Sequence, residues 1–162
     1  MRGIRDQLKP ARLLALLAPA VLLGGAYISQ YGFGLFPCEM CYWQRWPHMA
    51  AIALALLAIL LRRSPLGKPL LALAGLAIFV SGAIGVFHAG VEYHWWEGLT
   101  QCTSTISSGG GDMLARIMAA PIIRCDVAQW TLGGISLAGF NAIFSIGAAL
   151  AVWMLMAKGR RA

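Results

Sequence analysis

Residues 70–90 read LLALAGLAIFVSGAIGVFHAG, a run of 21 residues that contains no Asp, Glu, Lys or Arg. An α-helix rises about 1.5 Å per residue, so roughly 20 apolar residues in a row cross the hydrocarbon core of a bilayer. This run is therefore predicted to be a membrane-spanning helix. It also predicts that lipid, rather than water, surrounds much of the chain.

Three further apolar blocks accompany this run. They cover about residues 13–29, 42–61 and 131–156. The second block is short at its strictly apolar core, and it reaches sufficient length if the helix begins near Cys41 and includes Trp43 and Trp46 as interfacial aromatics. The chain is 59% hydrophobic and 12% charged, whereas a soluble domain carries about 25% charged residues. We predict an all-α membrane protein, a single domain over residues 1–162 with four transmembrane helices in a bundle.

The basic residues predict the orientation of this bundle. A net charge of +7 could indicate a nucleic-acid-binding protein. However, most of the basic residues fall in three short segments that flank apolar blocks: Arg2, Arg5, Lys9 and Arg12; Arg62, Arg63 and Lys68; Lys158, Arg160 and Arg161. This is the positive-inside pattern and not a basic face, so no nucleic-acid partner is predicted. Both termini are expected in the cytoplasm, and the loops at about 30–41 and 91–130 on the outer side.

An alternative interpretation of the first block stays open. A basic segment followed by an apolar block is also typical of a cleaved signal peptide. Cleavage near Ala26 would leave three spans with the same orientation.

All four cysteines fall in the two outer loops. Cys38 and Cys41 belong to the first, in FPCEMCYWQR at residues 36–45, and Cys102 and Cys125 belong to the second. Two cysteines three residues apart can close a small disulfide, and such pairs tend to be redox-active. Cys41 is expected at the N-terminal end of the second span, where the helix dipole favours a thiolate.

Arg45 lies one turn deeper than Cys41 on the same helix face. It is a cation on the side of the membrane where cations are disfavoured. A charged residue at such a position is costly, which indicates a functional role. We predict that it holds a thiolate or the oxygen of a reduced quinone. The alternative is that its side chain extends to lipid phosphates.

The second outer loop has two distinct parts. After Cys102 comes a Ser- and Gly-rich stretch, typical of a flexible linker. Residues 112–118 then predict a short interfacial helix, which Pro121 ends. Either a labile disulfide or a static link fits Cys102 and Cys125. Their spacing is not that of a zinc ribbon, so no metal site is predicted.

Several polar and small residues lie within the apolar blocks. His48 and Asn141 are predicted to be hydrogen-bonding core residues, and His88 is in addition a candidate donor to a quinone carbonyl. Small residues recur at four-residue spacing in the third and fourth spans: Ser81, Gly85 and Ala89; Gly134, Ala138 and Ala142. They predict either a close helix–helix contact or only the usual abundance of small residues in membrane helices.

These motifs together resemble the disulfide bond formation protein B (DsbB) family. The resemblance rests on Pro37-Cys38-x-x-Cys41 followed by Gln44-Arg45, on the four spans, and on two cysteines in the second outer loop. The segment from Cys125-Asp126 through Trp130 to Gly133-Gly134-Ile135-Ser136 is also similar to the family's entry to its fourth span.

The resemblance implies a quinone-dependent thiol oxidase of the bacterial inner membrane. Such an enzyme would oxidise a periplasmic DsbA-like protein and pass the electrons through Cys102–Cys125 and Cys38–Cys41 to ubiquinone, or to menaquinone. It implies that the partner attacks Cys102, that Cys125 leaves, and that Cys38 meets Cys102 in an inter-loop disulfide. Cys41 would face the quinone, with Arg45 supporting its charge.

Three other interpretations stay open at the level of sequence. The chain could be a membrane scaffold whose outer loops are held by structural disulfides, or a membrane protein that handles metals through cysteine and methionine. It could also be a specialised member of the family that serves one dedicated partner.

Overall fold

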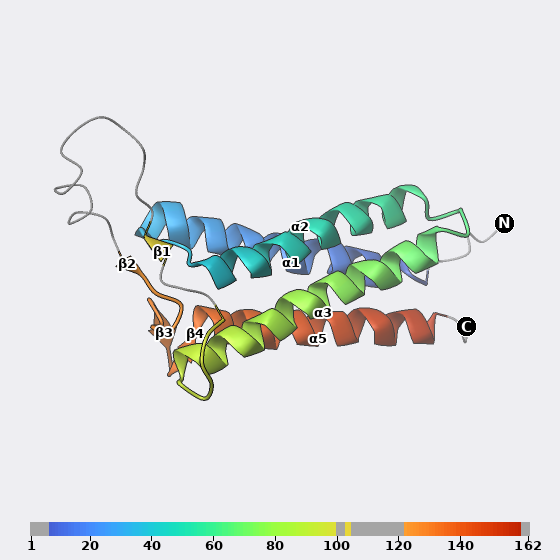
Figure 1. Ribbon diagram of the computed structural model, residues 1–162. Helices are drawn as coiled ribbons and strands as arrows, with labels where there is room; N and C mark the ends of the chain where they lie inside the picture. Colours follow the sequence, from blue (N-terminus) through green and yellow to red (C-terminus); the bar gives the residue numbers. More distant parts are fainter. Residues whose placement is uncertain (1–6, 100–102, 105–121, 160–162) are drawn as a thin grey trace.

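The computed structural model describes residues 7–99, 103–104 and 122–159. Long helices lie side by side in one bundle, and short strands gather at one end of it (Figure 1). The helices are α1 (Lys9–Phe33), α2 (Glu39–Leu60), α3 (Gly67–Glu92) and α5 (Leu137–Lys158). α1 begins and α5 ends at the end of the bundle opposite the strands (Figure 1). The predicted helical architecture is confirmed.

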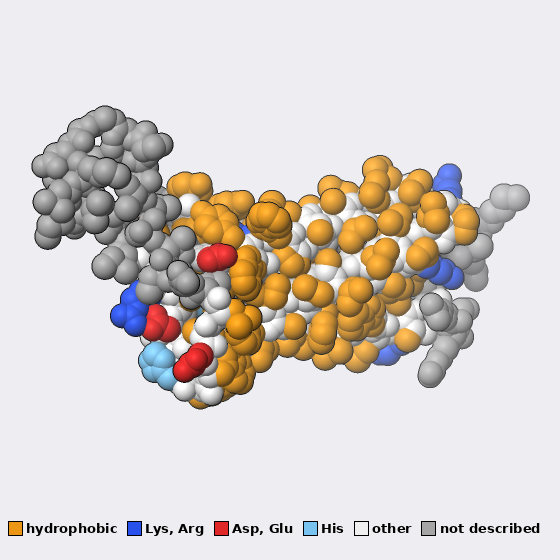
Figure 2. Space-filling model, in the orientation of Figure 1, with side chains coloured by type: hydrophobic (Ala, Val, Ile, Leu, Met, Phe, Trp, Pro, Cys, Tyr) orange, Lys and Arg blue, Asp and Glu red, His pale blue; other side chains and the backbone are white. Residues whose placement is uncertain are grey.

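Three of these helices, α1, α3 and α5, are long and apolar enough to cross a membrane. α2 is 22 residues long, but its first half carries Gln44, Arg45 and His48. All three side chains are buried in the bundle. The outer surface is instead covered by large apolar side chains, which form the broad hydrophobic zone in Figure 2. A surface of this kind suits lipid, where polar groups must find partners inside the protein.

Charged side chains lie at the two ends of this hydrophobic zone. Most Lys and Arg lie where α1 begins and α5 ends, whereas Asp and Glu gather, together with Arg124, at the end with the strands (Figure 2). The cysteine-bearing segments belong to the strand end. Which of the two ends faces the cytoplasm stays a prediction from these charges.

α2 begins at the cysteine pair. Cys38 is its N-cap residue, with an extended backbone and a sulfur that accepts a hydrogen bond from the Cys41 amide at 3.4 Å. The prediction that the second helix extends outward to Cys41 and its neighbouring aromatics is therefore confirmed. Both sulfurs lie at the first turn of α2.

The last helix begins at Leu137, later than the predicted start near residue 131. Before it, β3 (Thr131–Leu132) and β4 (Ile135–Ser136) form an antiparallel hairpin. Its turn consists of Gly133 and Gly134, whose φ angles are 58° and 80°. A two-residue turn of this kind needs positive φ at both positions, which glycine adopts without strain. Ser136 then caps α5 through its hydroxyl.

A second strand pair closes the base of the second outer loop. β1 (Thr103–Ser104) pairs antiparallel with β2 (Ile122–Ile123), so that Thr103 lies opposite Ile123. Cys125 follows two residues after β2. Cys102 and the predicted interfacial helix at 112–118 lie outside the described residues.

Small residues bring α3 and α5 into close contact. A Cβ atom on Gly85 would lie 3.0 Å from the Ala138 carbonyl oxygen and 3.0 Å from the Ala142 amide nitrogen. Ser81 on the same face of α3 is fully buried. The four-residue spacing therefore marks a specific packing face, except that Gly134 lies in the hairpin turn and not in the helix.

We predict that Gly85→Val lowers stability by about 1–3 kcal/mol, because a larger side chain would force the backbones of α3 and α5 apart. Gly147→Val on α5 is the matched control, since nothing lies within 4 Å of a Cβ atom at that position. Thermal unfolding in detergent, followed by tryptophan fluorescence, measures the difference. Equal melting temperatures for the two variants would contradict the tight packing at Gly85.

Candidate functional site

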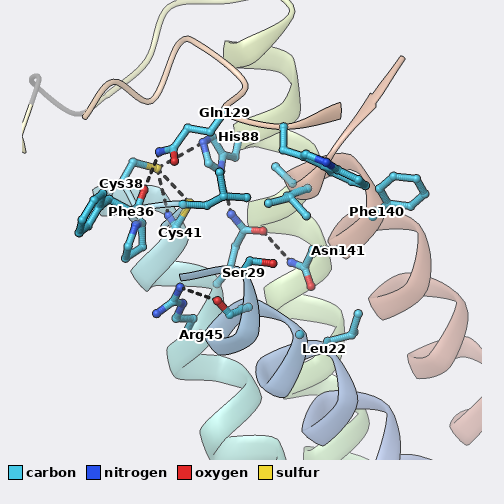
Figure 3. A pocket seen from close by; sticks show the side chains of 18 of the residues that line it. Leu22, Ser29, Phe36, Cys38, Cys41, Arg45, His88, Gln129, Phe140 and Asn141 are labelled. Atoms are coloured by element: carbon cyan, nitrogen blue, oxygen red, sulfur yellow. Dashed lines mark hydrogen bonds between the residues drawn. The ribbon is translucent and has the colours of Figure 1, made fainter. Parts of the chain in front are cut away.

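Three cysteines and one histidine come together at the strand end of the bundle. Cys38 Sγ lies 3.2 Å from Cys41 Sγ and 3.5 Å from His88 Nε2. The sulfur atoms of Cys38 and Cys125 and a ring nitrogen of His88 all lie within 4.8 Å of one another. Figure 3 shows Cys38, Cys41 and His88 grouped in this way. The structure thus brings Cys125 next to Cys38, whereas Cys102 lies outside the described residues.

The two sulfurs of the α2 pair differ in environment. Cys38 is 2% exposed, whereas Cys41 is partly exposed. Hydrogen bonding to Cys125 and Cys41, and then burial, raise the pKa of the Cys38 thiol. Cys38 therefore holds its proton at neutral pH in the reduced pair. Cys41 has the helix N-terminus beside it, which favours a thiolate there.

His88 is held by Gln44. Gln44 Nε2 donates to His88 Nδ1 at 2.8 Å and to the Met40 carbonyl at 3.2 Å. Because Nδ1 accepts this bond, the hydrogen of the neutral ring belongs on Nε2, the nitrogen that faces Cys38. Glu92 Oε1 lies 3.7 Å from the same Nε2. The ring can thus donate to a sulfur that carries negative charge.

Arg45 is buried against α1. Its guanidinium donates to Gln30 Oε1 at 2.6 Å and to the Ala26 carbonyl at 3.3 Å. It also lies 5.0 Å from the ring centroid of Tyr27 and 5.3 Å from that of Tyr42, within the range of cation–π attraction. The side chain is only 6% exposed. This geometry does not support the alternative in which Arg45 extends to lipid phosphates.

A hydrogen-bonded network continues from Gln44 into the interior of the bundle. Asn141 Nδ2 donates to Gln44 Oε1 at 2.7 Å, and Asn141 Oδ1 lies 2.9 Å from His48 Nε2. Ser145 Oγ donates to Asn141 Oδ1 at 2.9 Å, and Ser81 Oγ lies 3.0 Å from His48 Nε2. The predictions that His48 and Asn141 are hydrogen-bonding core residues are confirmed.

A cavity of about 270 Å³ lies beside the sulfurs, close to the lower end of the range for small-molecule sites. α1, α2, α3, α5 and the segment at 124–130 all contribute to its wall. Most of the lining is apolar, including Leu22, Phe36 and Phe140. Figure 3 shows the sulfurs at its loop end, Leu22 and Asn141 deeper between the helices, and Arg45 beside α1. An apolar ring with polar oxygens would match this lining.

The segment that carries Cys125 contains an ion pair and is joined to the first outer loop. An ion pair with Arg124 holds the pKa of Asp126 at about 2, so both residues flanking Cys125 are charged at neutral pH. Gln129 Nε2 donates to the Phe36 carbonyl and thereby joins the second outer loop to the first.

The start of α5 is attached in a similar way. The Tyr93 hydroxyl donates to the Gly134 carbonyl at 2.8 Å and accepts from the Ser136 amide at 2.9 Å.

Several members of this site are given no role by the sequence patterns, and Gln44 figures there only as part of the motif that carries the family resemblance. Gln30 and Gln44 orient Arg45 and His88, and Glu92 lies against His88. One signal could have identified Gln44: it is four residues from His48, on one face of a helix whose other faces are aromatic or aliphatic. Glu92 has a similar signal, because it lies four residues after His88 on the same helix. Gln30 has none, because its partner Arg45 comes from another helix.

Comparisons with known proteins agree on one family. The family model described as disulfide bond formation protein DsbB matches residues 8–155. Disulfide bond formation protein B 2 of Pseudomonas savastanoi pv. phaseolicola is 33% identical over 144 residues, which cover 85% of this chain and 81% of that protein. Disulfide bond formation protein B of Chromohalobacter salexigens is 30% identical over 138 residues, 75% of this chain and 80% of that protein. No solved structure matches the chain.

We predict that alkylation of the fully reduced protein at pH 7 modifies Cys41 at least about tenfold faster than Cys38. The thiolate is the reactive form, and the raised pKa of Cys38 keeps that sulfur protonated until the pH rises above the ordinary thiol range. Mass spectrometry of the peptides, after timed exposure to iodoacetamide, gives the two rates. Faster modification of Cys38 at neutral pH would contradict the assignment.

Proposed function

Because the chain belongs to the DsbB family of disulfide bond formation proteins, we propose that it oxidises a DsbA-like periplasmic protein and delivers the electrons to a membrane quinone. Membership establishes a membrane-bound oxidoreductase of disulfide bond formation. The finer proposal rests on one observation: Cys38 and Cys41 border an apolar cavity that Arg45 also lines, and the sulfur of Cys125 lies next to that of Cys38.

The first part of the proposed reaction is thiol–disulfide exchange in the second outer loop. A thiolate of the partner attacks Cys102 in a Cys102–Cys125 disulfide and releases Cys125 as a thiolate; the partner's second thiolate then frees Cys102 and leaves the partner oxidised. The pairing of Thr103 with Ile123 supports this disulfide, because it brings together the backbone next to Cys102 and the strand just before Cys125.

The second part transfers the electron pair to α2. The Cys125 thiolate attacks Cys38 in a Cys38–Cys41 disulfide, which forms a Cys38–Cys125 bond and releases Cys41 as a thiolate. The proximity of Cys125 to Cys38 supports this step. The predicted meeting of Cys38 with Cys102 stays a prediction. Attack of Cys102 on Cys125 then restores the loop disulfide and leaves Cys38 and Cys41 reduced.

The residues around the cavity fit a quinone. A quinone accepts two electrons and two protons when bound, and this is the number that the reduced Cys38–Cys41 pair gives up on closing its disulfide. The apolar lining suits a lipid-soluble ring, and Arg45 supplies a fixed positive charge near Cys41. Arg45 is positioned beforehand by Gln30 and by the two tyrosine rings, so no reorganisation is needed. The proposal covers ubiquinone, with menaquinone as the alternative.

Energetics explain why such an acceptor is needed. A DsbA-type protein is a strong oxidant at about −120 mV, whereas structural disulfides lie below about −300 mV. The gap of roughly 180 mV corresponds to about 8 kcal/mol for two electrons. Electron transfer from the partner to ordinary disulfides would therefore be unfavourable. A stronger oxidant dissolved in the bilayer is required to remove the electrons from the cysteines.

We also propose that α2 spans the membrane with the other three helices. Its buried Gln44, Arg45 and His48 lower its hydropathy, yet they face the interior and not lipid. The protein would then be a single four-helix domain of the bacterial inner membrane. Both termini would be cytoplasmic and the segments with the four cysteines periplasmic, as the distribution of charge supports.

Two rival functions use the same sulfurs. The atoms of Cys38, Cys125 and His88 within 4.8 Å of one another are also of the type that soft metals bind. Stoichiometric zinc or copper in the reduced, purified protein would favour that function. A scaffold with structural disulfides would resist mild dithiols, which should reduce the redox pairs readily.

We predict that Arg45→Met raises KM for a ubiquinone analogue by at least about tenfold and leaves KM for the reduced DsbA-like partner unchanged. Loss of a charge-assisted hydrogen bond of about 1.5–3 kcal/mol accounts for this size. Anaerobic turnover followed by quinone absorbance measures both constants.

Arg62→Met, at an exposed position at the opposite end of the bundle, is the matched control. Cys41→Ser in the same assay should abolish quinone reduction without loss of the fold. Unimpaired turnover of Cys41→Ser, or equal loss of both substrates in Arg45→Met, would refute these roles.

The proposed topology predicts the labelling of single introduced cysteines in an otherwise cysteine-free chain. Leu99→Cys, at the outer end, should react in intact spheroplasts with a membrane-impermeant maleimide. Ser64→Cys, in the turn between α2 and α3, should react only after the membrane is permeabilised. The opposite result at either position would exclude the proposed orientation.

A further inference from the structure

His48 is a buried polar residue for which the proposed relay has no use. It lies on α2 at 3% exposure and lines the cavity together with Cys41 and Arg45. The three residues follow one another at helical spacing, so they form one stripe along α2 from the sulfurs inward. An ionisable side chain at such a depth is costly and is by default a functional candidate.

The surrounding network determines which ring nitrogen of His48 carries the hydrogen. Asn141 Nδ2 donates to Gln44 Oε1 at 2.7 Å, which leaves Asn141 Oδ1 as an acceptor toward His48 Nε2 at 2.9 Å. Ser81 Oγ donates to the Gln44 carbonyl at 2.8 Å and so also presents a lone pair to His48 Nε2. Nε2 must therefore be the N–H of a neutral ring.

The other nitrogen, Nδ1, is consequently an acceptor. It is fully buried and has no hydrogen-bond partner among the described residues. A buried acceptor without a donor costs about 1–3 kcal/mol, and the rest of the network is fully bonded. Nε2 is engaged with α3 and α5, so Nδ1 is the ring nitrogen left without a partner among the described residues, on a side chain that lines the cavity.

We propose that His48 Nδ1 accepts a hydrogen bond from a hydroxyl of the hydroquinone product, and that His48 thereby makes the cavity bind hydroquinone in preference to quinone. This inference rests on the proposed function, because it requires that a quinone enters this cavity. The two ligand forms differ in just the property that Nδ1 recognises. A hydroquinone has two O–H donors, whereas a quinone has carbonyl oxygens that only accept.

The preference assists the overall reaction. Two thiols, at Cys38 and Cys41, lose two electrons and two protons as their disulfide forms, and the quinone gains the same electrons and protons to become a hydroquinone. His48 neither gains nor loses a proton in this balance. By stabilising the reduced ligand it shifts the equilibrium on the protein toward oxidised cysteines. His48 is thus a binding residue for the product form.

Two substitutions separate the nitrogens of the ring. His48→Gln places an amide where Nε2 was, so the contact with Asn141 can persist while the acceptor at Nδ1 is lost. His48→Asn places its amide near the position of Nδ1 and gives up the contact with Asn141. Both are made in full-length chain carrying Cys41→Ser, which prevents electron exchange with the ligand. The probes are a short-chain ubiquinone and its hydroquinone, bound anaerobically in detergent.

We expect His48→Gln to weaken hydroquinone binding about tenfold while the quinone Kd changes less than twofold, the size expected for one buried hydrogen bond. His48→Asn should keep most of the hydroquinone preference. An unchanged ratio of the two Kd values in His48→Gln, or equal loss of the ratio in both variants, would overturn the role of Nδ1. Failure of both ligands to bind with His48 intact would instead overturn the proposed quinone function.

A measurement without any substitution of His48 covers the case in which the variants do not fold. In protein labelled with ¹⁵N-histidine, hydroquinone should move the His48 Nδ1 resonance and quinone should leave it in place. The same displacement with both ligands would contradict the inference.

Discussion

The hydrogen bond from Gln44 Nε2 to His88 Nδ1 is the contact on which the organisation of this site depends. It joins α2 to α3 and sets the tautomer of His88, so that the ring presents its N–H to Cys38. Through its side-chain oxygen Oε1, Gln44 accepts a hydrogen bond from Asn141 Nδ2 of α5. One amide therefore connects the sulfur site to the interior of three helices. In surroundings of low dielectric such a network is strong when complete and costly when any member is missing.

This constraint also explains the unusual character of α2. In a soluble protein a helix buries its apolar face, whereas α2 buries Gln44, Arg45 and His48 and exposes Trp43 and Trp46. The arrangement is reasonable where the surroundings are apolar, since only the protein interior can supply hydrogen-bond partners there. α1 contributes the partners of Arg45, and without them a fixed charge at this depth would be expensive.

Much of this architecture could be predicted from local sequence, and the remainder could not for identifiable reasons. The run at 70–90 predicts its helix by length alone, and the spacing of Cys41 and Arg45 predicts one helix face. That Asn141 and His48 would bond other helices was predictable, because polar groups in apolar segments need partners.

Which partners Asn141 and His48 bind depends on the rotation of each helix relative to its neighbours. The spacing of residues within one helix carries no information about that rotation. The same holds for Cys125, which lies far from Cys38 in sequence and is positioned by the pairing of β1 with β2 and by the contact of Gln129 with the Phe36 carbonyl. Gly133 and Gly134 were assigned to a helix because they continue an apolar block, yet their positive φ angles make them a turn.

In the proposed reaction Cys38 has two tasks, because the sulfur that exchanges disulfides is also the cap of α2. A thiolate accepts a hydrogen bond from an amide more strongly than a thiol does, and sulfur already committed to a bridge accepts less. Each change of bonding at this atom therefore alters how firmly the first turn is wound. The proposed relay would therefore couple the covalent state of Cys38 to the backbone order of α2 at a single atom.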